Sequence, residues 1–300
     1  MSTRSPSTFI DRRTGTRRQD TIYRHGLLDW MYNSRMGWLL TRLFLSRKIV
    51  SQVYGWLNRR RSSARKIPHF VNAMGVDMTE SLRPVESFTS FNDFITREID
   101  VSRRPLHPDP LVCAAPADGR ILAFPTIDEK TRFILKQSGF TLQTLLRDDR
   151  MPLRYAGGSM LIERLYLADY HHFHFPADGI ARESISIPGR YYATTPYSRR
   201  WTVPFLAENH RQVTLLESDH FGSIAIIEVG AFTFGSIQQR FTPDSRVQRG
   251  QRKGMFELGG SAIVLLFEPQ SLRLDDDLCQ NTENGTETYV RLGESIGRAT

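Results

Sequence analysis

A serine that follows two glycines stands before an apolar run near the end of this 300-residue chain. Gly259, Gly260 and Ser261 lead directly into residues 262–267, which are apolar without interruption, and Pro269 closes the run. Such a run predicts a short buried strand. Glycine has no Cβ, so another group can approach its carbonyl closely. The pattern therefore suits attack of the Ser261 hydroxyl on the carbonyl of Gly260.

The same tripeptide occurs a second time, so the pattern alone does not identify a site. Gly157, Gly158 and Ser159 also precede an apolar stretch. Gly-Gly-Ser before a strand is most often only a turn. The other residues that could do chemistry must therefore decide between the two serines.

Two further groups of reactive residues lie at the ends of predicted strands. Asp118 precedes Gly119 at a tight turn, and His171, His172 and His174 fall within four residues. In an extended segment, His172 and His174 share one face and His171 lies on the other. Histidine is a metal ligand, but no cysteine or third well-placed ligand accompanies these three, so we predict no metal site.

Aspartate, histidine and serine thus occur in this chain order on three separate strand ends. This arrangement permits a triad in which the aspartate orients a histidine and the histidine deprotonates the serine. A hydrolase is the first alternative, but Ser261 is not part of the Gly-x-Ser-x-Gly turn of many hydrolases. Because Ser261 leads straight into a buried strand, attack on the chain's own peptide is the better interpretation.

Seven blocks, taken in order, resemble the phosphatidylserine decarboxylase family, whose members depend on a pyruvoyl group. The blocks are FTSFNDFITR (88–97), RP (104–105), PADGR (116–120), DYHHFHFP (169–176), AENHR (207–211), VGAFTFGSI (229–237) and KGMFELGGS (253–261). Each block alone is weak, and the combination is specific. The resemblance covers residues 85–268 and, more loosely, the N-terminal segment.

The resemblance implies self-cleavage between Gly260 and Ser261. His174 would take the hydroxyl proton of Ser261, with Asp118 orienting His174, and elimination would then convert Ser261 into the pyruvoyl group. The products would be a β chain of residues 1–260 and an α chain of residues 261–300. The pyruvoyl group would form a Schiff base with phosphatidylserine, so the implied activity is decarboxylation to phosphatidylethanolamine without a metal or pyridoxal phosphate.

The resemblance also assigns His171 to the decarboxylation step, as an acid or as a group that orients the carboxylate, and leaves His172 structural. Two features depart from the family pattern. Ala262 stands where Thr or Ser is usual, which predicts slow processing if that hydroxyl helps the elimination. Glu208 and His210 stand where Arg and Glu are usual, so the block at 207–211 receives no role.

Short helices and strands must position these candidate site residues. We expect strands over residues 120–124, 159–167, 223–232 and 261–267, and helices over residues 87–97 and 141–146, the first of them capped by Ser90 or Asn92. This order predicts an α+β fold with a β-rich core. Residues 1–20 are expected to be mobile, residues 58–70 to form a linker, and residues 271–300 to wrap the surface.

Residues 23–57 differ from the rest of the chain. Trp, Leu and Arg recur there at mixed spacings of three and four, which predicts two or three amphipathic helices broken near Gly37 and Gly55. Residues 1–66 contain 15 of the 40 Lys and Arg residues but 3 of the 32 Asp and Glu residues. This composition is typical of helices on an anionic lipid surface. Packing as a cap on the core is the alternative, and no nucleic-acid pattern is present.

We therefore divide the chain into a membrane-associating segment, residues 1–70, and a decarboxylase domain, residues 71–300. The expected partners are phosphatidylserine, an anionic membrane surface and the chain's own α and β chains, and a homodimer is left open. Two cysteines, no apolar run of transmembrane length and no signal peptide favour the cytoplasmic face of a bacterial inner membrane. The alternatives are a lipid-binding homologue that never cleaves and a pyruvoyl decarboxylase of a soluble amino acid.

Overall fold

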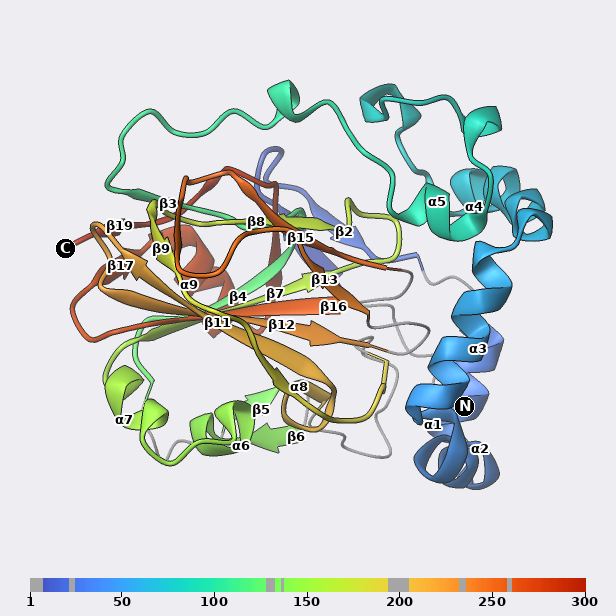
Figure 1. The fold of residues 1–300 in the computed structure, drawn as a ribbon, viewed down its shortest axis with the longest axis horizontal. Coiled ribbons are helices and arrows are strands. Elements are labelled where there is room, and N and C mark those ends of the chain that lie inside the picture. Colours follow the sequence, from blue (N-terminus) through green and yellow to red (C-terminus); the bar gives the residue numbers. More distant parts are fainter. Residues whose placement is uncertain are drawn as a thin grey trace.

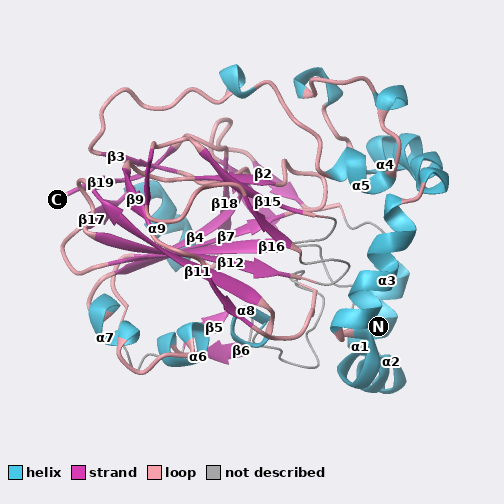
Figure 2. Cartoon of the chain, in the orientation of Figure 1, coloured by secondary structure: helices cyan, strands magenta, loops and turns pink. Residues whose placement is uncertain are grey.

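A large sheet forms the centre of the molecule, and helices and smaller sheets cover it (Figure 1; Figure 2). The computed structural model describes residues 8–21, 25–127, 133–135, 138–193, 205–231, 236–257 and 261–300. In these residues the sheet has 11 strands in the order β14-β9-β11-β12-β16-β7-β4-β18-β1-β2, and β10 pairs with β11 beside this path. The predicted α+β fold with a β-rich core is confirmed.

The strands of the large sheet are β1 (Thr8–Asp11), β2 (Arg17–Gln19), β4 (Gly119–Phe124), β7 (Ser159–Leu165), β9 (Gly179–Ala181), β10 (Ile185–Ile187), β11 (Arg211–Ser218), β12 (Ser223–Gly230), β14 (Ser245–Val247), β16 (Ser261–Phe267) and β18 (Glu287–Val290). One smaller sheet joins β13 (Ile237–Gln239), β15 (Arg252–Phe256) and β8 (His172–His174). A second joins β17 (Leu272–Leu274), β19 (Ser295–Ala299) and β3 (Val112–Ala114), and β5 (Phe133–Leu135) pairs with β6 (Ser138–Phe140). The paired strands are antiparallel except for β1 and β18, which are parallel.

The α-helices are α1 (His25–Asn33), α2 (Arg35–Leu40), α3 (Lys48–Arg59), α4 (Ile67–Met74), α5 (Phe91–Ile95), α6 (Leu142–Leu146), α7 (Met151–Tyr155), α8 (Phe205–Glu208) and α9 (Asp276–Glu283). The predicted helices at residues 87–97 and 141–146 correspond to α5 and α6. Ser90 caps α5 by accepting a hydrogen bond from the Asp93 N–H at 3.1 Å. The four predicted strands correspond to β4, β7, β12 and β16.

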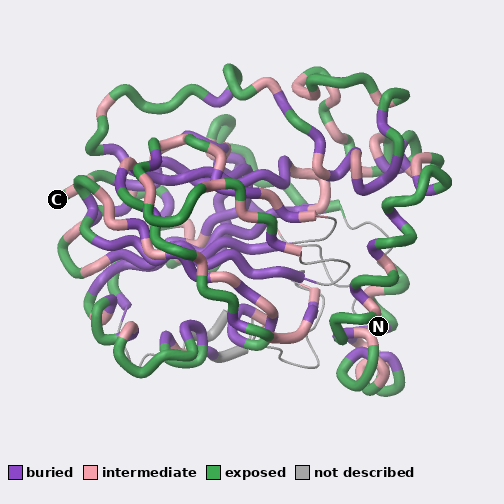
Figure 3. The backbone as a smooth tube through the Cα atoms, viewed as in Figure 1, coloured by how far each residue is buried: buried purple, intermediate pink, exposed green. Residues whose placement is uncertain are grey.

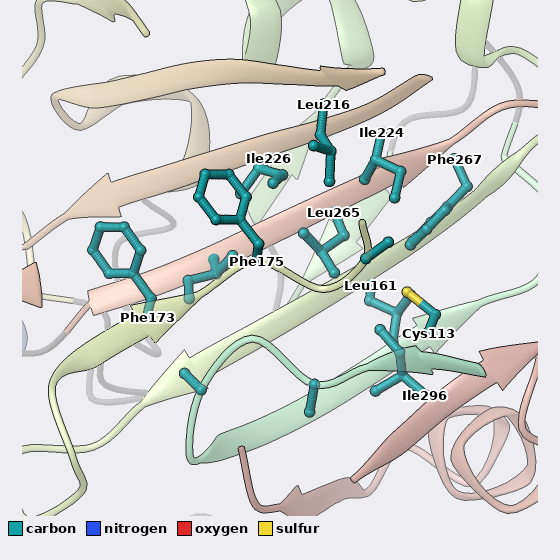
Figure 4. Close-up of a cluster of buried hydrophobic side chains, with 14 of the residues drawn as sticks. Cys113, Leu161, Phe173, Phe175, Leu216, Ile224, Ile226, Leu265, Phe267 and Ile296 are labelled. Atoms are coloured by element: carbon teal, nitrogen blue, oxygen red, sulfur yellow. The ribbon is translucent and has the colours of Figure 1, made fainter. Parts of the chain in front are cut away.

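β16 is buried on both faces because it lies between β7 and β12 and because both sides of the sheet are covered (Figure 3). Its odd-numbered apolar residues belong to one hydrophobic cluster and its even-numbered residues to another. In the first cluster, Phe173 and Phe175 lie over the strands that carry Leu265 and Ile226 (Figure 4). The second cluster contains residues of α6, α7 and α8. Alternation in a strand with two covered faces explains the uninterrupted apolar run.

The N-terminal helices break at serines and not at the glycines that the sequence analysis named. α1 ends before Ser34, whose hydroxyl accepts a hydrogen bond from the Gly37 N–H at 2.9 Å and so caps α2. Gly37 lies inside α2, where an added Cβ would lie 2.1 Å from the Trp30 carbonyl oxygen. Gly55 is buried inside α3. At Gly37 the glycine therefore permits close packing and does not end a helix.

Three segments that the sequence analysis placed outside the core belong to it. Residues 8–19 form β1 and β2, residues 61–74 form a 3-10 turn and α4, and residues 272–299 form β17, α9, β18 and β19. β18 lies inside the large sheet between β4 and β1. Buried ion pairs explain the misleading polarity: Arg164 of β7 contacts Asp20 at 2.8 Å and Glu287 at 2.7 Å. At Asp20 and Glu287 the polar sequence therefore reflects internal pairing of charges, whereas the polar strand β2 is exposed throughout.

Candidate active site

Ser261 is the first residue of β16 and lies opposite Leu165 of β7 and Gly230 of β12. Its side chain is 1% exposed, and its hydroxyl oxygen has no hydrogen-bond partner among the described residues. A buried polar atom that is left unpaired lowers stability and requires an explanation. Gly260, the other residue of the predicted cleavage site, lies outside the described residues.

The three histidines lie on and beside β8, which pairs with β15, the strand that leads toward Ser261. Nδ1 of His174 lies 2.8 Å from the Gly250 carbonyl oxygen, and its Nε2 has no partner among the described residues. Because a carbonyl only accepts hydrogen bonds, Nδ1 carries the proton and Nε2 is a free acceptor. Burial lowers the pKa of His174, so a neutral base is present near pH 7.

His171 and His172 are also held by main-chain carbonyls. Nε2 of His171 lies 3.3 Å from the Leu167 oxygen, and Nε2 of His172 lies 3.0 Å from the Thr96 oxygen. Burial, with the charge of Arg97 as the second cause, lowers the pKa of His171 to about 3. Burial lowers the pKa of His172 to about 4. The side chains of His172 and His174 both contact the ring of Tyr170, so they share a face as the alternation predicts.

Asp118 lies next to the histidine strand, but its carboxylate is occupied by other groups. It accepts hydrogen bonds from Arg104 at 3.0 and 2.7 Å and from the Leu292 N–H at 2.8 Å. Among the described contacts, Nδ1 of His174 bonds to Gly250 and not to Asp118. The two segments meet through the backbone, because the His174 N–H donates to the Pro116 carbonyl at 2.8 Å. Burial lowers the pKa of His174, the hydrogen bond to Gly250 raises it, the charge of Arg252 lowers it, and the charge of Asp118 raises it as the smallest of these effects.

Two buried carboxyl groups near Ser261 escaped the sequence analysis. Glu163 of β7 and Glu228 of β12 both lie opposite Ile263 in the sheet, two positions along β16 from Ser261. Nζ of Lys253 lies 2.8 Å from Glu228, and both side chains are 0% exposed. Burial raises the pKa of Glu163 well above its usual range. The available signal was a glutamate within each of two largely apolar stretches, residues 160–165, which also contain Arg164, and residues 223–230.

A family model of phosphatidylserine decarboxylase matches residues 91–298 of this chain. The chain belongs to the phosphatidylserine decarboxylase family. It is 37% identical over 291 residues to a phosphatidylserine decarboxylase proenzyme of Chlamydia felis and 38% identical over 291 residues to one of Chlamydia pneumoniae, with 97% of each chain covered. It is 37% identical over 289 residues to the Fusobacterium nucleatum proenzyme, with 96% of each chain covered. A glucose permease IIA from Mycoplasma capricolum matches 62% of this chain and 94% of its own, with a TM-score of 0.30 and 14% identity, which is too distant to inform the fold.

In this chain, the block at 207–211 holds backbone in place beside Ser261. The Asn209 amide donates to the Tyr192 and Gly230 carbonyls at 2.8 Å each, which fixes the end of β12 opposite Ser261. The Arg211 guanidinium donates to four main-chain carbonyls. The ring of His210 lies 5.8 Å from that of Tyr191. The contacts of Asn209 and Arg211 are therefore structural.

Ala262, the residue after Ser261, faces the opposite side of the large sheet. Ala262 lies opposite Arg164 and Val229 and belongs to the second hydrophobic cluster, whereas Ile263 belongs to the first. Since side chains alternate along a strand, Ala262 and Ser261 point to opposite faces. The described residues include no group of three or more His, Cys, Asp or Glu side chains that could hold a metal ion.

The neutral histidines predict acid sensitivity of the decarboxylase fold. His172 has a folded pKa of about 4 and an unfolded value of about 6.5, so the unfolded chain binds more protons between these pH values. Stability from this residue is present above pH 6.5 and is lost as the pH falls. We expect His172→Gln to recover about 2 kcal/mol at pH 5 relative to pH 7. Thermal unfolding at both pH values tests this.

The exposed His220 provides the matched control for this measurement. His220→Gln should leave the difference in melting temperature between pH 5 and pH 7 unchanged. An equal shift for both variants would contradict the assignment to the buried His172 ring.

Proposed function

We propose that this chain is a proenzyme that cuts itself between Gly260 and Ser261 and then decarboxylates phosphatidylserine to phosphatidylethanolamine. The observation that carries the proposal is the buried Ser261 hydroxyl, which has no partner among the described residues and lies at the start of β16, two positions from the buried Glu163 and Glu228. Ser159 is also buried without a hydroxyl partner at the start of β7, but it pairs with Phe267 at the opposite end of β16. The names of the curated relatives support both the precursor and the substrate.

In the cleavage step, Nε2 of His174 takes the proton of the Ser261 hydroxyl, and the oxygen attacks the Gly260 carbonyl carbon. The peptide C–N bond breaks, the proton passes to the Ser261 nitrogen, and an ester joins the two halves. Loss of the Ser261 Cα proton and breakage of the Cβ–O bond then release the Gly260 carboxylate. Water displaces the nitrogen as ammonia and leaves the pyruvoyl group on residue 261. The negative charge of Asp118 favours the imidazolium that His174 becomes.

In the decarboxylation step, the pyruvoyl group supplies an electron sink for the loss of carbon dioxide. The buried Ser261 position fits such a group, because the facing residue of β12 is Gly230, which has no side chain. Pairing of β16 with β7 and β12 holds the new N-terminus in place. We assign proton transfer or orientation of the substrate carboxylate to His171, whose low pKa keeps it neutral.

The opposite orientation of Ala262 supports a chain that cleaves over a lipid-binding homologue that does not. A hydroxyl at position 262 would project into the second hydrophobic cluster and away from the face that carries Ser261. Its absence therefore removes no group from the Ser261 side of the sheet.

The N-terminal helices support a lipid substrate over a soluble amino acid. Ten large apolar side chains of residues 27–57 are exposed: Leu27, Trp30, Met36, Leu39, Leu43, Phe44, Ile49, Val53, Trp56 and Leu57. Arg42, Arg47 and Lys48 are exposed among them. Apolar and basic side chains together suit an anionic leaflet. Within the proposed membrane-associating segment, residues 1–70, we assign contact with the leaflet to the helices over residues 25–59, because β1 and β2 belong to the large sheet and α4 contributes Ile67 and Phe70 to a buried cluster. We assign the protein to the cytoplasmic face of a bacterial inner membrane. Within the described ranges, no helix has both the length and the apolar character needed to span a bilayer.

Cleavage is tested by comparing the two serines that follow Gly-Gly. Purified wild-type protein should show a 40-residue fragment on a denaturing gel, and mass spectrometry of its N-terminus should find a pyruvoyl group. Ser261→Ala should abolish the fragment because it removes the attacking oxygen. Ser159→Ala should leave cleavage intact. A single uncut chain in active wild-type protein would exclude the mechanism.

The same gels test the groups around Ser261. His174→Ala and Asp118→Asn should each block cleavage, because the first removes the base and the second the charge that stabilises its protonated form. Glu80 also pairs with Arg104, at 2.7 Å, and with Arg291, at 3.1 Å. Glu80→Gln is therefore the control for weakened ion pairing of Arg104, and this variant should still be cut. His171→Ala should be cut and should lose at least about 10²-fold in decarboxylation. If Asp118→Asn and Glu80→Gln block cleavage equally, Asp118 acts only as a structural partner of Arg104.

Vesicle flotation tests the N-terminal helices. Replacing Ile49 and Val53 by Ser should weaken binding to phosphatidylserine vesicles at least about tenfold, since each loses its apolar contact with the leaflet. These side chains are 68% and 54% exposed. Leu153 and Ile185 are similarly exposed, at 62% and 58%, and their replacement by Ser should leave flotation unchanged. If both double variants bind the vesicles equally well, the N-terminal helices pack on the core and do not contact the membrane.

A further inference from the structure

Helix α3 contacts the segment of chain that precedes the predicted cleavage site. α3 stands beside the end of the large sheet at which β16 begins (Figure 1). Its last residue, Arg59, places Nη2 2.5 Å from Oε2 of Glu257. The two residues are 198 positions apart in sequence, and Glu257 lies four positions before Ser261.

The chain is held firmly on both sides of the predicted cut. Before it, the Phe256 N–H donates to the His171 carbonyl at 2.8 Å and the Glu257 N–H donates to the Ser236 carbonyl at 3.0 Å. After it, Ser261 pairs with Leu165 and Gly230. The Glu257 side chain is 12% exposed and the Arg59 side chain is 50% exposed, so the carboxylate is largely removed from water while the guanidinium lies at the surface.

Arg59 belongs to a part of α3 that is anchored in the protein interior. Asn58 is 0% exposed, and its carbonyl accepts a hydrogen bond from the Ser63 hydroxyl at 2.8 Å. The Ser63 oxygen in turn accepts the Phe91 N–H at 2.9 Å, which joins the end of α3 to the start of α5. Tyr54 packs against the cluster that contains Phe91. The Arg59 backbone is therefore a fixed point from which its side chain holds Glu257.

Self-cleavage depends on such fixed points because the attacking oxygen and the carbonyl carbon must stay in near contact. Correct placement of reacting groups contributes several powers of ten to a rate, and small displacements lose much of it. Glu257 and Ser261 are the described residues that flank the predicted cut. An ion pair at Glu257 therefore fixes a side chain of the described chain directly before the cut.

We propose that Arg59 is a positioning residue for self-cleavage and acts through Glu257. The N-terminal helices then serve the maturation of the active site as well as membrane association. This inference rests on the proposed cleavage before Ser261. Its alternative is an ordinary surface ion pair, which contributes little to stability and nothing to the rate of cleavage.

The test follows self-cleavage in time after synthesis of the full chain in a cell-free translation mixture, with the two products separated on denaturing gels. Arg59→Gln and Glu257→Gln should each slow cleavage about two- to fivefold, and the double variant should be no slower than either single variant. Arg59→Glu should slow it further by repulsion, and the exchanged pair Arg59→Glu with Glu257→Arg should restore much of the rate.

Arg60 provides the matched control, because its guanidinium lies 4.5 Å from the centre of the Trp56 ring and not on Glu257. Arg60→Gln should cleave at the wild-type rate. Each substitution is also placed in the Ser261→Ala background, where thermal unfolding of the uncut chain should change by less than about 2 °C.

Three outcomes separate the possibilities. Slow cleavage with unchanged unfolding and recovery in the exchanged pair supports the inference. Wild-type rates in Arg59→Gln and Arg59→Glu overturn it and leave the proposed function intact. Absence of cleavage in the wild-type chain overturns the proposed function itself.

Discussion

Pairing of β16 with β7 on one side and β12 on the other is the constraint on which the site depends. The pairing begins at Ser261 itself, so the reactive residue has no freedom to move along or out of the sheet. Both neighbours bring further groups into register, including the buried carboxyl groups opposite Ile263. The histidine strand β8 lies over the same face of the sheet, joined to β15 and to the backbone before Asp118. In the proposed mechanism, the fixed position of Ser261 in the sheet is what would make its hydroxyl reactive.

The surroundings also set the protonation states. The histidine side chains are almost fully buried and each is held by a main-chain carbonyl, so neutral imidazole is the favoured form. A carbonyl fixes which ring nitrogen carries the proton without adding a charge. In this chain Gly250 does this for His174, while Asp118 is engaged by Arg104 and acts on the ring from a distance. Orientation and electrostatic support, which one aspartate provides in many triads, are here divided between two groups.

The sequence predicted the elements whose pattern is local. Alternation, apolar runs and caps located β4, β7, β12, β16, α5 and α6, and the resemblance selected Ser261 over Ser159. Features that depend on partners distant in sequence were missed. β1 and β18 read as polar segments, because the ion pairs of Asp20 and Glu287 with Arg164 form only once the sheet is assembled. The role of Gly250 at His174 and the Arg59–Glu257 pair are likewise contacts that no spacing rule reveals.

The C-terminal 40 residues do not form a separate layer, and this determines when the protein can mature. β16 occupies the middle of the large sheet, and β18 lies three positions away between β4 and β1. A ribosome must therefore release almost the whole chain before β7, β12 and β4 acquire these neighbours. The N-terminal strands β1 and β2 likewise cannot join the large sheet until β18 has been synthesised. The proposed cleavage at Ser261 would therefore have to wait until synthesis is nearly complete, because its strand partners and β18 assemble only then.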